Sequence, residues 1–203
     1  MKVIAITGGL GTGKSAVLSI ISTFGKPTLE SDEVVHRIYQ DNENVRTELF
    51  RRWGSEAFHP DSSVNGKFIS DRIFTQPSEK EWLQELMHPY VWEAIQEESQ
   101  KSRDMLYCAI PLLFEIGWQR YFDETVTVWC DRKTRFLRLM QQGWSQDEIT
   151  RRSNTQMDID QKLAMADFGI INTGTWPLLE EQCRRIIYKR PAPEASQNYE
   201  HKN

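Results

Sequence analysis

Residues 3–15 of the chain read VIAITGGLGTGKS, and this stretch decides the fold. The apolar residues 3–6 predict a buried strand. Residues 8–15 then match the pattern G-x-x-x-x-G-K-S, which is typical of a phosphate-binding loop. Glycines let backbone N–H groups surround phosphate oxygens, Lys14 adds a positive charge, and Ser15 offers a hydroxyl to Mg²⁺. The sequence therefore predicts a nucleotide phosphate site near the start of the chain.

The segment after this loop predicts the helix that such a site requires. Val17, Ile20, Ile21 and Phe24 recur at helical spacing. The alternative is a glycine-rich turn that binds nothing, but the pattern and both flanking segments favour a phosphate site. The residues expected to bind the nucleotide are Gly8, Gly11, Thr12, Gly13, Lys14, Ser15 and Ala16.

Short apolar runs alternate with longer helical patterns, which is typical of βαβ units around a parallel sheet. The expected strands are residues 3–7, 28–30, 106–110, 125–130 and 169–171. We therefore predict an α/β protein of the P-loop NTPase class, with a five-stranded parallel sheet flanked by helices.

A long stretch between the second and third expected strands has no strand signal and predicts helices instead. One apolar stripe consists of Val45, Leu49, Phe50 and Trp53, and another of Trp82, Leu83, Leu86 and Met87. So many helices between two strands imply an inserted helical lobe. The expected parts of the domain at residues 1–189 are a core of residues 1–40 and 104–189 and a lobe of about residues 41–103. Residues 190–203 have almost no apolar content, so we expect a disordered tail.

Composition narrows the class of protein. A chain of 203 residues fits one domain, and its net charge of -4 with scattered Lys and Arg argues against a nucleic-acid partner. No stretch approaches the roughly 18 apolar residues of a membrane span. Cys108, Cys130 and Cys183 lie far apart and form no C-x-x-C pair, which indicates reduced core thiols. We expect a cytoplasmic protein that is a monomer or a weak homo-oligomer.

Residues 30–33, Glu-Ser-Asp-Glu, follow the second expected strand. They fall at the carboxyl edge of the sheet, where folds of this class bind ligands. Asp32 could take a proton from an attacking hydroxyl or help to hold Mg²⁺. It could equally be the N-cap of the helix that follows. The residue alone leaves these two roles open.

Five segments in order resemble those of one enzyme family. They are TGGLGTGKS at residues 7–15, ESDEVVHR at 30–37, LMHP at 86–89, IPLLFE at 110–115, and Gln156 with KLAMAD at 162–167. Through these segments nearly the whole chain resembles the dephospho-coenzyme A kinases. That family uses ATP to phosphorylate the ribose 3'-hydroxyl of dephospho-CoA, the last step of coenzyme A synthesis.

The resemblance implies roles for particular residues. Asp32 and Lys14 would be catalytic, Ser15 would ligate Mg²⁺, and a lid would cover the site at about residues 141–156. The residues implied to bind the small-molecule substrate are Arg37, His88, Leu112 and Glu115. Two of these have ordinary alternatives: His88 could be an extended residue before Pro89 that ends one helix, and Glu115 a solvated loop residue.

The chain also departs from the family pattern. Gln141 stands where the family has a lid arginine, and Ile171 stands where the family's late I-D-N has its acid, while Asn172 matches the Asn of that pattern. A cation that stabilises phosphoryl transfer is worth several orders of magnitude in rate, so activity would be reduced unless Arg138, Arg151 or Arg152 substitutes. Asp131 resembles a Walker B acid, but we expect it to cap the helix over residues 132–141.

Three functions remain open at this point. The first is a dephospho-CoA kinase, the second a kinase for another nucleoside or nucleotide, and the third a catalytically weakened nucleotide-binding protein. The third would explain Gln141 and the late acid that is lost at Ile171. A signalling GTPase is disfavoured because the chain contains no N-K-x-D guanine-reading segment.

Overall fold

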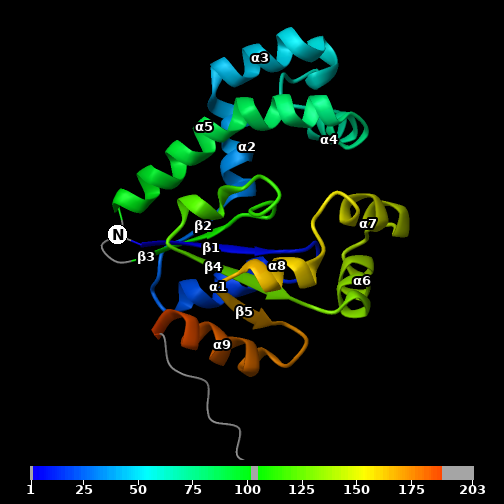
Figure 1. The fold of residues 1–203 in the computed structure, drawn as a ribbon. Helices are drawn as coiled ribbons and strands as arrows, with labels where there is room; N and C mark the ends of the chain where they lie inside the picture. Colours follow the sequence, from blue (N-terminus) through cyan, green and yellow to red (C-terminus); the bar gives the residue numbers. More distant parts are fainter. Residues whose placement is uncertain (1, 102–104, 189–203) are drawn as a thin grey trace, which may run out of the picture.

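The protein is built on a parallel sheet of five strands in the order β2-β3-β1-β4-β5, as a computed structural model shows (Figure 1). The structure describes residues 2–101 and 105–188, so the predicted tail at 190–203 lies outside the described residues. The strands are β1 (Lys2–Gly8), β2 (Thr28–Glu30), β3 (Met105–Ala109), β4 (Glu124–Trp129) and β5 (Phe168–Ile171). All five predicted strands are confirmed, with ends that differ by a residue or two.

The first strand lies at the centre of the sheet. Ile4 pairs with Tyr107 of β3 on one side and with Glu124 of β4 on the other. Both faces of β1 are covered, which explains its continuous apolar sequence. The glycine-rich loop therefore leaves the carboxyl end of the central strand, where parallel sheets place their ligands.

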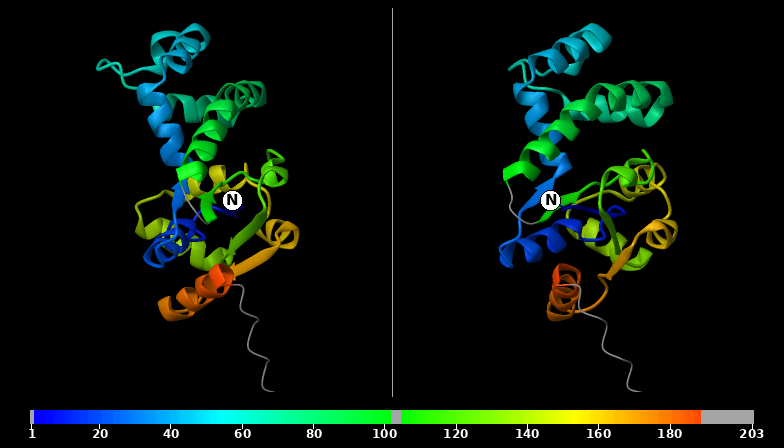
Figure 2. Two further views of the ribbon diagram at one scale, coloured as in Figure 1. Left: turned by 90° about the vertical axis from the view of Figure 1, so that its left-hand side faces the viewer. Right: turned by 60° about the vertical axis from the view of Figure 1, so that its left-hand side comes forward.

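Helices cover both faces of the sheet (Figures 1 and 2). On one face, α1 and α9 pack against each other and against Ile6, Val128 and Ile170. On the other face, α2, α5 and the segment at 110–122 enclose Leu106 and Cys108. The α-helices are α1 (Lys14–Thr23), α2 (Ser31–Asp41), α3 (Glu43–Trp53), α4 (Gly66–Thr75), α5 (Pro77–Lys101), α6 (Arg132–Gln141), α7 (Gln146–Ser153), α8 (Ile159–Met165) and α9 (Trp176–Tyr188).

A separate hydrophobic core holds α3, α4 and the first half of α5 together above the sheet. Trp53 and Trp82 meet edge to face with ring centroids 5.0 Å apart, and the Trp53 indole donates a 2.8 Å hydrogen bond to Glu79. The predicted stripe on α3 is partly wrong, because Phe50 is 58% exposed whereas Leu49 is fully buried. Phe50 points to the outer side of α3, where it meets Phe58.

The course of helix α5 excludes one of the two interpretations of His88. The helix continues through His88 and Pro89 to Lys101 without a break, so His88 is not an extended residue between two helices. Packing on both sides of the proline accounts for this continuity. Met87 before it is buried in the upper core, and Val91 after it is buried against the sheet. This burial outweighs the one backbone hydrogen bond that proline removes.

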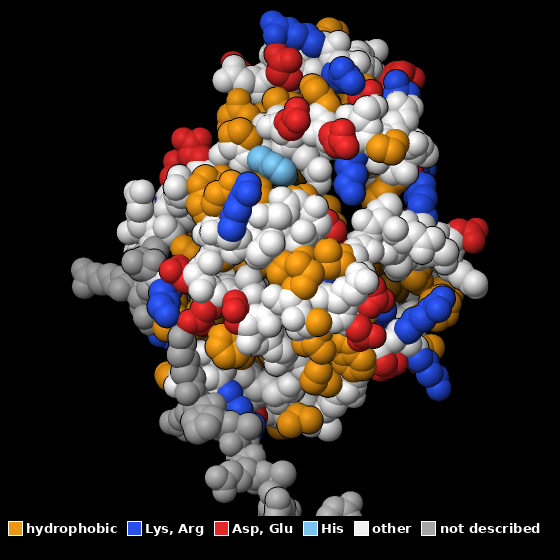
Figure 3. All heavy atoms as spheres, in the orientation of Figure 1, with side chains coloured by type: hydrophobic (Ala, Val, Ile, Leu, Met, Phe, Trp, Pro, Cys, Tyr) orange, Lys and Arg blue, Asp and Glu red, His pale blue; other side chains and the backbone are white. Residues whose placement is uncertain are grey.

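Other local expectations are confirmed. Asp131 is the N-cap of α6, and its side chain accepts a 2.9 Å hydrogen bond from the Thr134 N–H. All three cysteines are buried and unpaired. Across the described residues, we find no helix with the length and apolar character to cross a bilayer. Figure 3 shows Lys and Arg mixed with Asp and Glu over one face of the molecule, as the scattered sequence charges predict.

The contrast between Leu49 and Phe50 gives a test of the upper core. We expect Leu49→Ala to lower the free energy of unfolding by about 2–5 kcal/mol, because it removes buried methyl groups and leaves a cavity. Phe50→Ala, the matched control on the same helix, should change it by about 1 kcal/mol or less. Urea unfolding followed by circular dichroism measures both values. Equal losses in the two variants would contradict this description of the core.

Candidate active site

The glycine-rich loop needs glycine at two positions for different reasons. Gly13 has a φ of 94°, in the left-handed region, and a Cβ atom there would lie 2.2 Å from the Asn172 side-chain nitrogen. Gly8 has a φ of 154°, and a Cβ atom there would lie 2.6 Å from the backbone carbonyl oxygen of Val128 in β4. The neighbouring strand and the Asn172 side chain therefore lie so close to the loop that only glycine leaves room at these two positions.

Hydrogen bonds from distant segments fix the same loop. The Asn172 amide, just after β5, donates a 2.8 Å hydrogen bond to the Thr12 carbonyl. The Gln156 side chain, just after α7, accepts a 2.9 Å hydrogen bond from the Leu10 N–H. Thr12 is buried and bonds to the Gly9 carbonyl within the loop. Asn172 thus has a structural role, because it holds the loop from the residue that follows the lost acid position at Ile171.

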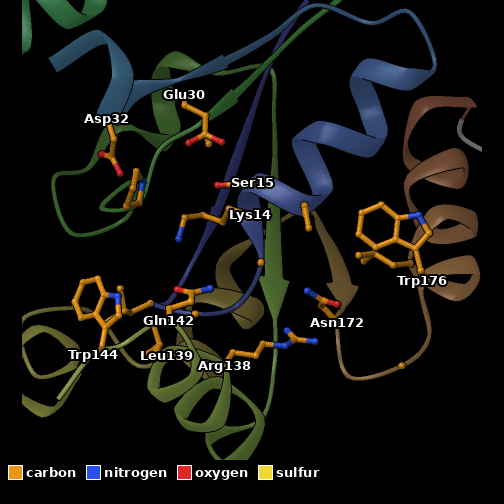
Figure 4. Close-up of a pocket in the computed structure, with 18 of the residues that line it drawn as sticks. Lys14, Ser15, Glu30, Asp32, Arg138, Leu139, Gln142, Trp144, Asn172 and Trp176 are labelled. Atoms are coloured by element: carbon orange, nitrogen blue, oxygen red, sulfur yellow. The ribbon is translucent and has the colours of Figure 1, made fainter. Parts of the chain in front are cut away.

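The loop opens onto a cavity of about 540 Å³. Of the expected nucleotide-binding residues, Gly11, Gly13, Lys14, Ser15 and Ala16 line it, whereas Gly8 and Thr12 do not. Carboxylates of Glu30 and Asp32 face the same space from the end of β2 and the start of α2 (Figure 4). The structure therefore brings the loop lysine, the loop serine and Asp32 together around one cavity.

Lys14 extends into this cavity from the first turn of α1 (Figure 4). Its ammonium donates hydrogen bonds to the carbonyls of Gly8 and Gly9, at 3.2 and 3.1 Å. Burial, and after it the positive charge of Lys162, lower the pKa of Lys14 to about 8. A phosphate anion would oppose both effects, so this position favours an anionic ligand.

Asp32 is not a helix cap. The N-cap of α2 is Glu30, and Asp32 lies in the first turn, where the structure gives its carboxylate no capping hydrogen bond. Desolvation raises the pKa of Asp32, and the nearby charge of Lys14 partly opposes this. The N-cap alternative is therefore wrong. An uncommitted carboxylate with a raised pKa beside a phosphate loop can accept or orient a proton.

Glu115 is not a solvated loop residue. Its side chain is 13% exposed, and one carboxylate oxygen lies 2.8 Å from the ammonium of the fully buried Lys162. The same oxygen accepts a 2.9 Å hydrogen bond from the Met157 N–H, while the other oxygen is buried without a partner. Lys162 also donates to the Pro111 carbonyl at 2.7 Å. The sequence analysis named Lys162 only as part of a family-like segment. Its ion pair with Glu115 was missed because no local pattern reveals a partner 47 residues away.

The other residues expected to bind substrate lie away from the cavity wall. Arg37 is exposed on α2, beside a second hollow that Asp32 also lines. His88 packs against Trp118, with ring centroids 4.7 Å apart, and burial lowers the pKa of its imidazole. Leu112 is half-buried in the turn after β3. Asp32, which lines both the cavity and this second hollow, connects Arg37 with the phosphate loop.

The lid region differs from expectation at Gln141. That residue is exposed at the end of α6, and its neighbour Gln142 lines the cavity instead. Arg138 reaches the cavity from α6. The sequence reading missed Trp176, a cavity-lining side chain that is 56% exposed at the start of α9. Its apolar character gave no signal, because most tryptophans of such a chain belong to the core.

Comparisons with known proteins agree with this geometry. A sequence model of the family described as dephospho-CoA kinase matches residues 2–177. A Helicobacter pylori dephospho-CoA kinase is 32% identical over 190 residues, which are 91% of this chain and 95% of the relative. An Anaeromyxobacter dehalogenans dephospho-CoA kinase is 30% identical and covers 92% of the chain, which in turn covers 91% of that enzyme.

Solved structures show the same fold. A Thermus thermophilus protein, 27% identical in sequence, superposes on this chain with a TM-score of 0.82. The superposition covers 94% of this chain and 98% of the Thermus chain. The dephospho-CoA kinase of Campylobacter jejuni, at 22% identity, has a TM-score of 0.65 over 92% of this chain and 96% of its own. Family match, relatives and fold agree along nearly the whole length. The chain belongs to the dephospho-CoA kinase family.

Proposed function

We propose that this protein transfers the γ-phosphoryl group of ATP to the ribose 3'-hydroxyl of dephospho-CoA. The observation that carries the proposal is the single cavity in which Lys14 and Ser15 of a phosphate loop face the uncommitted carboxylate of Asp32. Buried free cysteines support a reducing compartment such as the cytoplasm. The family membership favours dephospho-CoA over another nucleoside or nucleotide as the acceptor.

The cavity suggests how ATP lies. Trp176 and Asn172 border one side, while the Lys14 ammonium points toward the side that holds Asp32 and Trp144 (Figure 4). An exposed indole is a suitable surface for a nucleobase, and the ammonium a suitable partner for the terminal phosphates. We place the adenine toward Trp176 and the γ-phosphate toward Asp32 and Trp144.

The acceptor then approaches from the α2 side. Asp32 lines the phosphate cavity and also two hollows along α2, one of which includes Arg37. A hydroxyl placed at Asp32 would face the γ-phosphate beside Lys14. Asp32 would accept or orient its proton, and Arg37 could bind an acceptor phosphate. The contacts of His88, Leu112 and Glu115 with substrate stay predictions.

Oxygen ligands at the cavity fit Mg²⁺. The exposed hydroxyl of Ser15 opens onto the cavity near the carboxylates of Glu30 and Asp32, and Mg²⁺ prefers oxygen ligands together with substrate phosphates and water. Ser15 would hold the ion, which would neutralise phosphate charge. Because phosphoryl transfer needs little covalent help, the remaining work of the chain is to position the reactants and to stabilise charge.

The direct test follows ADP release with ATP, Mg²⁺ and dephospho-CoA, with adenosine and shikimate as alternative acceptors. Of these three acceptors, we expect only dephospho-CoA to support turnover. Lys14→Ala should reduce it below detection, because the charge at the terminal phosphates is lost, and Lys67→Ala on the exposed surface of α4 should retain it. Turnover with a different acceptor, or full activity of Lys14→Ala, would contradict the proposal.

Asp32→Asn tests the proton acceptor. Asparagine keeps the shape but not the anionic form, so we expect kcat to fall about 10²-fold with thermal unfolding unchanged. Steady-state kinetics and calorimetry measure the two quantities. A kcat of Asp32→Asn equal to that of the wild type near neutral pH would contradict the role.

The pH profile adds a second readout on Asp32. Because its pKa is raised, kcat of the wild type should decline with falling pH sooner than an ordinary aspartate would allow, since the protonated form cannot act as a base. The decline should be absent in Asp32→Asn. Lys14 is the charged group that opposes the effect of burial on Asp32. The other charged or titratable side chains beside Asp32 include Glu30, Glu33, His36, Arg37 and Glu98.

A further inference from the structure

Two adjacent arginines on α7 lie in opposite environments. Arg151 forms a 3.0 Å ion pair with Asp71 of α4. The guanidinium of Arg152 lies over the ring of Trp144, with its carbon 4.4 Å from the ring centroid. The Arg152 Nε is buried and has no hydrogen-bond partner. Arg151 is thus committed to the helical lobe, whereas Arg152 is held by an aromatic face.

No carboxylate in the described residues forms an ion pair with Arg152. Glu148, one turn earlier on α7, interacts with it at longer range, but its carboxylate is bonded to Ser145 in a capping box. A cation–π contact holds an arginine in place without neutralising its charge. Arg152 therefore keeps a full positive charge and free donors, which suit a phosphate anion.

Trp144 connects this cation to the cavity. It lines the cavity together with Lys14 and Asp32, and it lies on the side toward which the Lys14 ammonium points (Figure 4). Arg138 approaches from α6 near Asn172, away from that side (Figure 4). The two arginines thus approach different parts of a bound polyphosphate. Arg152 is held on Trp144, which lies at the end where we place the γ-phosphate.

We propose that Trp144 is a positioning residue that holds Arg152 beside the γ-phosphoryl group, and that Arg152 is the catalytic cation which Gln141 does not supply. The proposal rests on the proposed function for the orientation of ATP. During transfer, negative charge develops on the oxygens between donor and acceptor, and a planar guanidinium can donate to two of them. The indole face fixes the side chain beforehand and releases it more readily than a carboxylate would.

Binding of nucleotides without any acceptor tests the contact. Calorimetry gives the dissociation constants of ADP and of a non-hydrolysable ATP analogue with an imido bridge, both with Mg²⁺. We expect Arg152→Ala to raise the dissociation constant of the ATP analogue about tenfold and that of ADP less than about twofold, because only the analogue has a γ-phosphate. Arg151→Ala, the adjacent control, should change neither. An unchanged ratio of the two constants in Arg152→Ala would overturn the proposal.

Turnover tests the catalytic part. We expect kcat of Arg152→Ala to fall about 10²–10³-fold, more than its ATP affinity, with partial recovery in millimolar guanidinium chloride. Trp144→Phe keeps an aromatic face, so its kcat should stay within about threefold of the wild-type value, whereas the kcat of Trp144→Ala should fall about tenfold. Full activity of Arg152→Ala or of Trp144→Ala, each with native thermal unfolding, would overturn it.

The two proposals can fail separately. A wild-type protein that does not phosphorylate dephospho-CoA would refute the proposed acceptor. The ratio of ATP-analogue to ADP affinity in Arg152→Ala would still decide whether this arginine contacts the γ-phosphate, because that measurement contains no acceptor.

Discussion

The structure depends on how the backbone of the phosphate loop is held. A loop that must present its N–H groups to a ligand cannot use them for its own stability, so other parts of the chain must support it. Asn172 binds the Thr12 carbonyl from beyond β5, and Gln156 binds the Leu10 N–H from the end of α7. The Arg135 side chain of α6 lies beside Gly9. The elements that line the rest of the cavity are thus the same ones that shape the loop.

A buried ion pair beneath the cavity extends this support. Lys162 is completely enclosed, and Glu115 and the Pro111 carbonyl are the partners of its ammonium. Two buried charges are costly to desolvate, and apolar side chains would fill the space with less penalty. The pair instead connects the turn after β3 with Met157, directly after the segment predicted to form a lid. Its lysine adds to the effect of burial in lowering the pKa of Lys14. It therefore shapes both the geometry and the charge of the phosphate site.

The sequence predicted those features that local patterns determine. All five strands follow from short apolar runs, and the loop follows from glycines and a lysine at fixed spacing. The prediction failed where long-range contacts decide. The helix α5 continues through Pro89 because residues on both sides of the proline are buried. On α3, Val45, Leu49 and Trp53 form the buried face, which leaves Phe50 outside. Residue types alone could not reveal that Glu115 pairs with Lys162 or that Arg152 lies on Trp144.

Helix α5 has a mechanical consequence. Its 25 residues form a rod of roughly 37 Å at the usual rise per residue. Leu83 and Met87 in its first half belong to the upper core, while Val91 and Ile95 in its second half belong to the core between α5 and the sheet. A single unbroken helix therefore shares its side chains between both cores. The upper helices cannot loosen independently of the sheet, so a displacement at Trp82 would tilt the whole rod and shift the contacts at Ile95 as well.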